Sequence, residues 1–318
     1  MITLHQLSAA PDAALIAARS LIADATAADG QDPVSDQALL AVTQGQRELT
    51  LFAESPVGER IVAAGIVGDG EVDLVVRPEE RGRGVGSAAL AALIARADET
   101  AASAERPVQL RAWAHGDNPA AEALLLGAQF VPVRSLFRMA LDPALLPHTS
   151  PERAATDPAL ALSRFDAARD AADWVRVNAA AFATHPEQGR ITEADFALIR
   201  EEPWFDPEDL LLLRDSDGSL LGSAWIKTVR DTASGAVESE LYAVGVDPAS
   251  AGRGLGRVLL NAALARMAEH SPRSVTLYVD GDNERAVKLY ETAGFTIDSR
   301  SRQWARRATD DASARMNA

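Results

Sequence analysis

The chain has 318 residues, 47% of them hydrophobic, and a formal net charge of -15 at neutral pH. This length favours two domains with substantial cores, and the acidic balance argues against nucleic acid as a partner. With no cysteine and only scattered histidines, neither disulfides nor a metal site is expected. We also expect a cytoplasmic monomer without a membrane partner, since no export signal or apolar run of about 18 residues occurs.

The first half alternates helices and strands. The patterns predict helices over residues 12–28 and 36–47, and then strands over 49–53, 60–67 and 71–76, the last stopped by Pro78. A glycine-rich run opens a helix to about residue 102, and a strand at 108–114 and a helix at 118–126 follow. Four prolines between Leu141 and Pro158 indicate a linker. We therefore set the domains at 1–141 and 159–318, joined by a linker at 142–158.

The second half repeats the same order of elements. Helices are predicted over 167–182 and after Thr192, where Thr192-Glu-Ala-Asp195 fits a capping box. Strands at 210–214 and 220–228 pair across a turn, and a central strand at 239–246 follows. A helix from about Gly254, a strand near 276–279 and a helix that carries Tyr290 complete the unit. The charged tail after Arg302 is expected to fray.

The two halves align on one another residue by residue. Pro78 matches Pro248, and Arg83-Gly-Val-Gly86 matches Arg253-Gly-Leu-Gly256, both at an offset of 170. Asp117-Asn118 then matches Asp282-Asn283, and Phe130 matches Phe295, both at an offset of 165. The sequence therefore predicts a tandem repeat of one domain of about 150 residues.

Each half carries a glycine-rich turn that feeds a helix. Such a turn aims backbone N–H groups and the positive end of the helix dipole at one point, which suits a pyrophosphate. Arg81-Gly-Arg-Gly-Val-Gly86 resembles the acetyl-CoA loop of the GCN5-related N-acetyltransferase superfamily, and the second copy departs only at Ala251. Asp282 to Tyr290 resembles the other superfamily signature. The resemblance implies an α/β (α+β) fold of two tandem domains, each a mixed, mostly antiparallel sheet flanked by helices.

A closer resemblance, to the mycothiol synthase family of tandem acetyltransferases, covers nearly the whole chain. It rests on Asn178-Ala-Ala-Ala-Phe-Ala-Thr-His-Pro-Glu-Gln-Gly189, Trp204-Phe-Asp-Pro207, Tyr242–Pro248, Leu277-Tyr-Val-Asp, and Trp113-Ala-His-Gly116. This resemblance implies acetyl transfer from acetyl-CoA to the cysteinyl amine of a cysteinyl-glucosaminyl-inositol, which gives mycothiol.

Amide formation from a thioester needs a base for the amine, a polarised carbonyl and a proton donor for the departing thiolate. Glu240 is the candidate base and Tyr290 the candidate acid; the plain alternatives are a strand-end glutamate and a packed tyrosine. The repeat favours the catalytic roles, because the first half has Gly70 and Leu125 at these positions. We therefore expect the first half to bind acetyl-CoA without turning it over.

The resemblance also implies binding residues. Coenzyme contacts are expected along the central strands, the glycine loops and the last helix: Leu74, Val75, Val76, Gly82, Arg83, Gly84, Val85, Gly86, Ser87, Val244, Gly245, Val246, Ala251, Gly252, Arg253, Gly254, Leu255, Gly256, Arg257, Asn283, Glu284, Arg285, Ala286, Val287 and Lys288. The expected acceptor contacts are Asp36, where the family has glutamate, Glu187, Lys227, Glu240 and Tyr278.

Three other interpretations remain open. A dinucleotide dehydrogenase would use Gly84-Val-Gly-Ser-Ala-Ala89, but the second copy has Leu259 where glycine or alanine is required. A protein that only binds acetyl-CoA would need neither Glu240 nor Tyr290. A tandem acetyltransferase could instead act on another small amine, such as an aminoglycoside or a peptide.

Overall fold

The computed structural model describes residues 2–7, 10–55, 60–103, 109–155, 157–183, 188–232 and 234–307. They form two compact units. Unit 1 comprises the described parts of Met1–Leu136, Asp280–Asp282 and Ser299–Ala318, and unit 2 comprises those of Phe137–Val279 and Asn283–Asp298. Within the described residues, no helix is long and apolar enough to cross a membrane.

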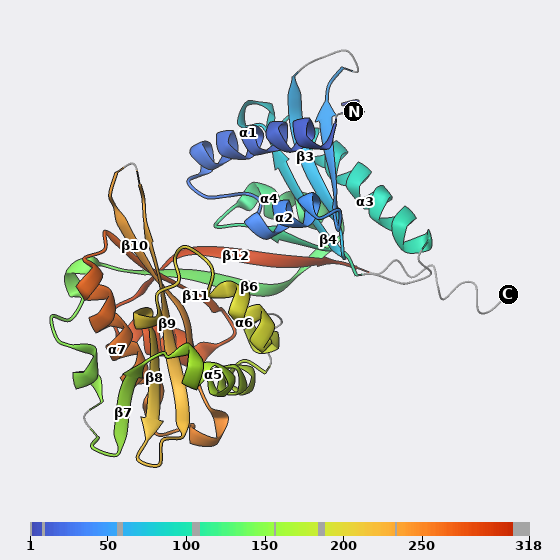
Figure 1. Ribbon diagram of the computed structural model, residues 1–318. Coiled ribbons are helices and arrows are strands. Elements are labelled where there is room, and N and C mark those ends of the chain that lie inside the picture. Colours follow the sequence, from blue (N-terminus) through green and yellow to red (C-terminus); the bar gives the residue numbers. More distant parts are fainter. Residues whose placement is uncertain are drawn as a thin grey trace. The chain divides into compact units, whose positions relative to one another are not determined.

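Unit 1 is a six-stranded sheet with helices on both faces (Figure 1). The strand order is β1-β2-β3-β4-β5-β12, and every pair is antiparallel except β4–β5. Helices α1 and α2 share one core with the sheet, and α3 and α4 share the other. The elements are β1 (His5–Leu7), α1 (Pro11–Asp29), α2 (Asp36–Thr43), β2 (Glu48–Ala53), β3 (Ile61–Gly68), β4 (Glu71–Val76), the 3-10 turn Pro78–Glu80, α3 (Val85–Ser103), β5 (Arg111–Ala114) and α4 (Pro119–Gly127).

Unit 2 repeats this plan with the order β6-β11-β10-β9-β8-β7. Its pairs from β7 to β10 are antiparallel, and β10–β11 is parallel. The elements of unit 2 are β7 (Leu160–Arg164), α5 (Ala167–Ala181), α6 (Glu193–Ile199), β8 (Leu210–Asp215), β9 (Leu220–Arg230), β10 (Val237–Val246), α7 (Leu255–His270), β11 (Ser274–Asp280) and α8 (Glu284–Thr292), with 3-10 turns at Pro143–Leu145, Pro151–Ala154, Gln188–Arg190, Pro207–Asp209 and Pro248–Ser250. Strands β6 (Phe130–Leu141) and β12 (Thr296–Arg306) each have residues in both units.

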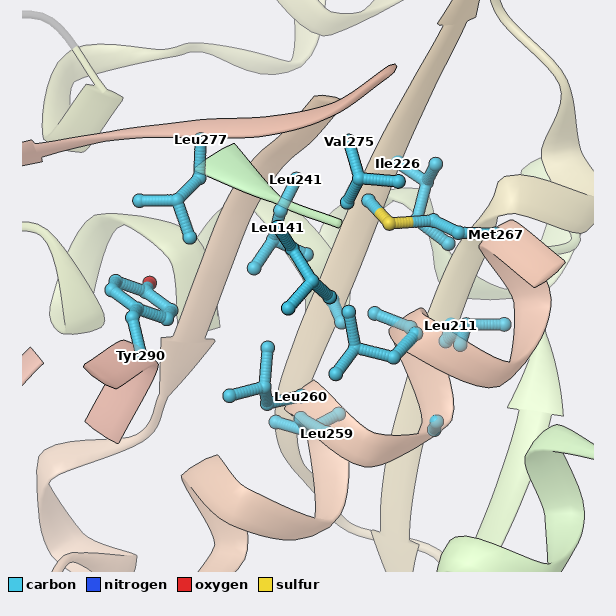
Figure 2. Close-up of a cluster of buried hydrophobic side chains, with 14 of the residues drawn as sticks. Leu141, Leu211, Ile226, Leu241, Leu259, Leu260, Met267, Val275, Leu277 and Tyr290 are labelled. Carbon is cyan, nitrogen blue, oxygen red and sulfur yellow. The ribbon is translucent and has the colours of Figure 1, made fainter. Parts of the chain in front are cut away.

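The two faces of the unit 2 sheet differ in character. Helices α7 and α8 cover a core of mainly aliphatic side chains, part of which Figure 2 shows. Helices α5 and α6 cover a core rich in aromatic rings, including Trp174, Phe196 and Trp225. Alternate residues of β9 and β10 therefore point into chemically different layers.

The structure confirms the predicted fold, in which the strands of each unit are mixed, mostly antiparallel and flanked by helices. The predicted capping box is also present: the Thr192 hydroxyl accepts from the Asp195 N–H, and the Asp195 carboxylate accepts from the Thr192 N–H. Helix α2 is shorter than predicted and ends at Thr43. The predicted linker carries two 3-10 turns, and its Leu146 and Pro151 are buried.

Strands β6 and β12 were not predicted, and the expectation that the chain frays after Arg302 is wrong for the residues up to Arg306, whereas residues 308–318 lie outside the described residues. Residues Arg302 to Ala305 pair with β5, and Trp304 is buried in the core under α3 and α4. The end of the second repeat thus completes the sheet of unit 1, whereas the sequence-based bounds place it in the second domain. A frayed tail was expected because the many charged residues there obscure the alternation of apolar and polar residues that is typical of a strand.

Candidate active site

A slot opens between β10 and β11 in unit 2. The two strands pair only from Glu238 to Leu241 and from Ser274 to Leu277. Both strands continue, β10 to Val246 and β11 to Asp280, without further pairing in the register. Beyond the last β10–β11 pair, an extended ligand can lie along these strands as an added strand.

A β-bulge in β10 lies at the start of the slot. The register with β9 shifts between Leu241 and Ala243, so that Tyr242 is the extra residue. As a result Tyr242 and Ala243 both pack in the aromatic core, while Leu241 and Val244 face the aliphatic core. A bulge interrupts the ladder and changes the direction of the backbone groups beside it.

Unit 1 lacks this distortion. Its β3–β4 register runs without a shift from Gly68 opposite Glu71 to Ala63 opposite Val76. Asp69 and Gly70, which form the turn before β4, both have positive φ, 50° and 77°. Gly70 therefore serves the turn at the position where unit 2 carries Glu240, and a side chain there would be strained.

Glu240 lies on β10, partly buried, immediately before the bulge. Burial raises the pKa of its carboxyl above the ordinary value, and Lys227 and Arg138 oppose that rise. Lys227 is its direct partner across the β9–β10 ladder, so both side chains leave the sheet on the same face. Arg138, on the unpredicted strand β6, forms an ion pair with Asp298. A carboxylate with a raised pKa beside two cations is well suited to general-base work.

Lys227 also contacts an aromatic ring. Its Nζ lies 5.0 Å from the centroid of Trp204, which packs against Tyr242 at 5.3 Å between centroids. Neither Trp204 nor Arg138 was among the predicted site residues. Trp204 was noted only as part of a motif, and no local pattern brings it to Lys227, because a loop and two strands must first fold together.

The other predicted acceptor residues are less closely defined. Tyr278 lies on β11 beyond the last residue that pairs with β10, and it is half exposed, at 51%. Glu187 lies outside the described residues. Asp36 begins α2, but its side chain lies outside the described part of the structure.

Tyr290 lies on α8, in the aliphatic core on the other face of the sheet from Glu240. Figure 2 shows its side chain extending from α8 toward Leu277, with the hydroxyl at the far end. Burial raises the pKa of this phenol to about 12. Its counterpart in unit 1, Leu125, is equally buried but has no proton to donate. A thioester that enters the slot would therefore meet Glu240 from one face and Tyr290 from the other.

The two glycine loops share one backbone conformation. Gly82 and Gly84 have φ of 73° and 90°, and the matching Gly252 and Gly254 have φ of 83° and 77°. Each loop leads directly into a long helix, α3 or α7, whose first N–H groups have no helical acceptor. These paired left-handed turns fit the predicted pyrophosphate cradle in both units.

The arginines around the loops differ between the units. In unit 1, Arg81 forms an ion pair with Asp29, and Arg83 is paired with Glu80 and Glu54. In unit 2, Arg253 and Arg257 are exposed and have no ion pair among the described residues. Two exposed cations beside the cradle favour phosphate binding in unit 2.

The start of α8 completes this side of the slot. The Asn283 side chain caps the helix by accepting from the Ala286 N–H at 3.1 Å, just as Asn118 caps α4 in unit 1. The predicted contacts Glu284, Arg285, Val287 and Lys288 therefore lie on the first turns of a capped helix. Gly256 of α7 packs near Leu289 of α8, which keeps the two helices close.

The chain matches a known family model and solved structures. The acetyltransferase (GNAT) family model matches residues 34–127 and 174–295. Two solved structures share the fold over 96–97% of the chain: a GCN5-related N-acetyltransferase from Sphaerobacter thermophilus, with a TM-score of 0.68 at 23% identity, and a tandem GNAT protein from the clavulanic acid biosynthesis pathway, with 0.65 at 19%. The alignments cover 97% and 99% of the two solved chains, respectively.

Curated relatives are much more similar in sequence. The mycothiol acetyltransferase of Kineococcus radiotolerans is 44% identical over 87% of this chain and 88% of its own length. That of Geodermatophilus obscurus is 38% identical over 92% and 94%. That of Clavibacter michiganensis is 42% identical over 85% and 84%. The chain thus belongs to the acetyltransferase (GNAT) family, and within it to the mycothiol acetyltransferases.

Proposed function

We propose that unit 2 transfers the acetyl group of acetyl-CoA to the cysteinyl amine of cysteinyl-glucosaminyl-inositol, giving mycothiol and CoA. The observation that carries this proposal is the slot between β10 and β11, with Glu240 and the Tyr242 bulge on one face and Tyr290 on the other. The names of the relatives supply the acceptor, since the geometry alone specifies an amine and not its substituents.

In this reaction the amine nitrogen attacks the thioester carbonyl carbon, a C–N bond forms and the C–S bond breaks. Glu240 receives the proton that the amine loses, directly or through water. A model α-amino group has a pKa of about 8, so at neutral pH the base removes a proton that solvent does not take. Backbone groups from Val244 to Val246 stabilise the charge that develops on the carbonyl oxygen.

Tyr290 acts on the departing sulfur. With a pKa of about 12 the phenol stays protonated throughout any practical assay range and donates a hydrogen bond to the thiolate. Complete proton transfer to a thiolate of ordinary pKa, about 8.5, is uphill by roughly three units or more. Stabilisation by hydrogen bonding is therefore its principal role, and the thiolate takes its final proton from solvent.

Acetyl-CoA is the cosubstrate of unit 2, and we propose that the cradle of unit 1 binds a second molecule without turnover. Unit 1 has the left-handed glycines of the loop but no bulge, no carboxylate at Gly70 and no hydroxyl at Leu125. Unit 1 thus lacks the bulge, the carboxylate and the hydroxyl to which we assign the chemistry of unit 2. Binding and catalysis are thus separated between two copies of one fold.

The test is an assay of the full chain with acetyl-CoA and a panel of amines, followed by mass spectrometry and CoA release. The panel contains cysteinyl-glucosaminyl-inositol, an aminoglycoside and a peptide amine. We expect N-acetylation of the cysteinyl acceptor to be fastest, with its thiol still reactive toward a maleimide. Faster turnover of another amine, or acetylation of the thiol, would overturn the assignment of the acceptor.

A further inference from the structure

The Trp204 ring lies near the end of Lys227 and belongs to a group of aromatic side chains. Trp204 lies in the loop before β8, with its ring centroid 5.6 Å from that of Trp225 and 5.3 Å from that of Tyr242. Trp225 and Tyr242 are themselves 5.1 Å apart and nearly perpendicular. Two strands and one loop therefore fix the orientation of the Trp204 ring.

The face of that ring is turned to a cation. Lys227 Nζ lies 5.0 Å from its centroid, and tryptophan is the best aromatic partner for an ammonium group. A lysine side chain has about 2 kcal/mol of rotamer entropy to lose when it is held in one place. The Trp204 ring holds the Lys227 ammonium near Glu240, and Glu240 is the partner of Lys227 across the β9–β10 ladder.

We propose that Trp204 is a positioning residue, which acts through Lys227 to hold the ammonium group on the acceptor side of Glu240. The inference rests on the proposed function, because it makes Lys227 a contact for the hydroxyl-rich acceptor. It assigns to Trp204 a part in acceptor binding in addition to packing.

Burial distinguishes Trp204 from the other tryptophans of this core. Trp174 and Trp225 are 1% and 0% exposed, as packing residues are, whereas Trp204 is only partly buried. A tryptophan that served packing alone would not need to present its face to the ammonium group of Lys227. The position of Trp204 beside the bulge residue Tyr242 also places it next to the reacting centre.

The sequence offers a direct test of geometry, because Lys227 and Lys288 are its only two lysines. Lys288 is 80% exposed and serves as an internal reference. In the full chain with 13C-labelled lysine, we expect the ε-methylene protons of Lys227 to be shifted upfield by the ring. The shift should be lost in Trp204→Leu and largely kept in Trp204→Phe; Lys288→Arg assigns the signals. Lys227 and Lys288 signals that coincide in the unmodified chain would overturn the proposal.

A double-mutant cycle tests the consequence for binding. We expect Trp204→Leu to raise the acceptor KM several-fold, and at most ~30-fold, with the acetyl-CoA Kd unchanged. In a Lys227→Met background, the same change should raise the acceptor KM no further. An equal rise in both backgrounds would show that Trp204 only packs. Failure of the unmodified chain to acetylate the cysteinyl acceptor would refute the proposed function instead, and the lysine spectra would still report on Trp204.

Discussion

Glu240 on β10 lies directly opposite Lys227 on β9, one residue before the register shifts at Tyr242. The carboxylate and the ammonium thus share the face on which the bulge begins. Tyr290 lies in the core on the other face of the sheet, so we propose that a thioester in the slot between β10 and β11 contacts both Glu240 and Tyr290.

Glu240→Gln should lower kcat by roughly 10²–10⁴-fold, the usual loss when a general base is removed. The acetyl-CoA Kd should change little, because backbone groups and the glycine loop hold the coenzyme. Steady-state kinetics combined with calorimetry checks both values. Glu238→Gln, on the same strand but exposed and paired with Arg273, is the matched control and should retain full kcat.

The same Glu240→Gln change should stabilise the fold at neutral pH. The folded-state pKa of Glu240 is raised, so its contribution is fully present below the unfolded value of about 4.5 and is lost as pH rises through the folded pKa. Melting temperatures at pH 4 and pH 8 test this sign. We expect equal values at pH 4 and a higher one for the variant at pH 8; a lower one would contradict the assignment.

Tyr290→Phe should lower kcat at every pH between 6 and 10 by the same factor. The reason is that a phenol with a pKa of about 12 does not ionise in that range, so its removal cannot shift an alkaline limb. Profiles of kcat against pH for both proteins give the comparison. A limb near pH 9 that disappears in the variant would mean that the phenol titrates far below 12.

Gly254→Ala and Gly84→Ala form a matched pair, one in each glycine loop. Both residues have positive φ, and an added Cβ would meet nothing at Gly254 and only Ile2 at 3.8 Å at Gly84. Each change should therefore cost roughly 1–2 kcal/mol of stability through backbone strain. Only Gly254→Ala should raise the acetyl-CoA KM. Similar KM changes in both variants would mean that unit 1 takes part in turnover.

Asp209→Ala should destabilise the chain by about 3 kcal/mol, at the lower end for breaking a buried ion pair. Asp209 is 1% exposed and accepts from Arg266 Nε at 2.7 Å; His270 Nε2 lies 2.8 Å from the same oxygen. The loss of stability is limited because Arg266 keeps its hydrogen bond to Glu269, at 2.7 Å. Urea unfolding measures it, with Glu238→Gln as an exposed-pair control expected to cost less than about 1 kcal/mol.

The repeat and most of its elements can be predicted from local patterns of residues. Pro78 and Pro248 stop strands, and Gly84 and Gly254 take up positive φ, for reasons that lie within a few residues of each. In the alignment of the two halves, Glu240 corresponds to Gly70 and Tyr290 corresponds to Leu125. These inferences needed only local conformation and residue chemistry.

The other features could not be predicted from local patterns, because strand register and burial depend on residues far apart in the chain. The bulge at Tyr242 appears only when β10 is laid against β9. Strand β12 ends on β5, so Trp304 completes a core that begins some 250 residues earlier. In the same way, the pKa of Glu240 depends on burial and on Lys227 and Arg138, which no pattern near Glu240 could indicate.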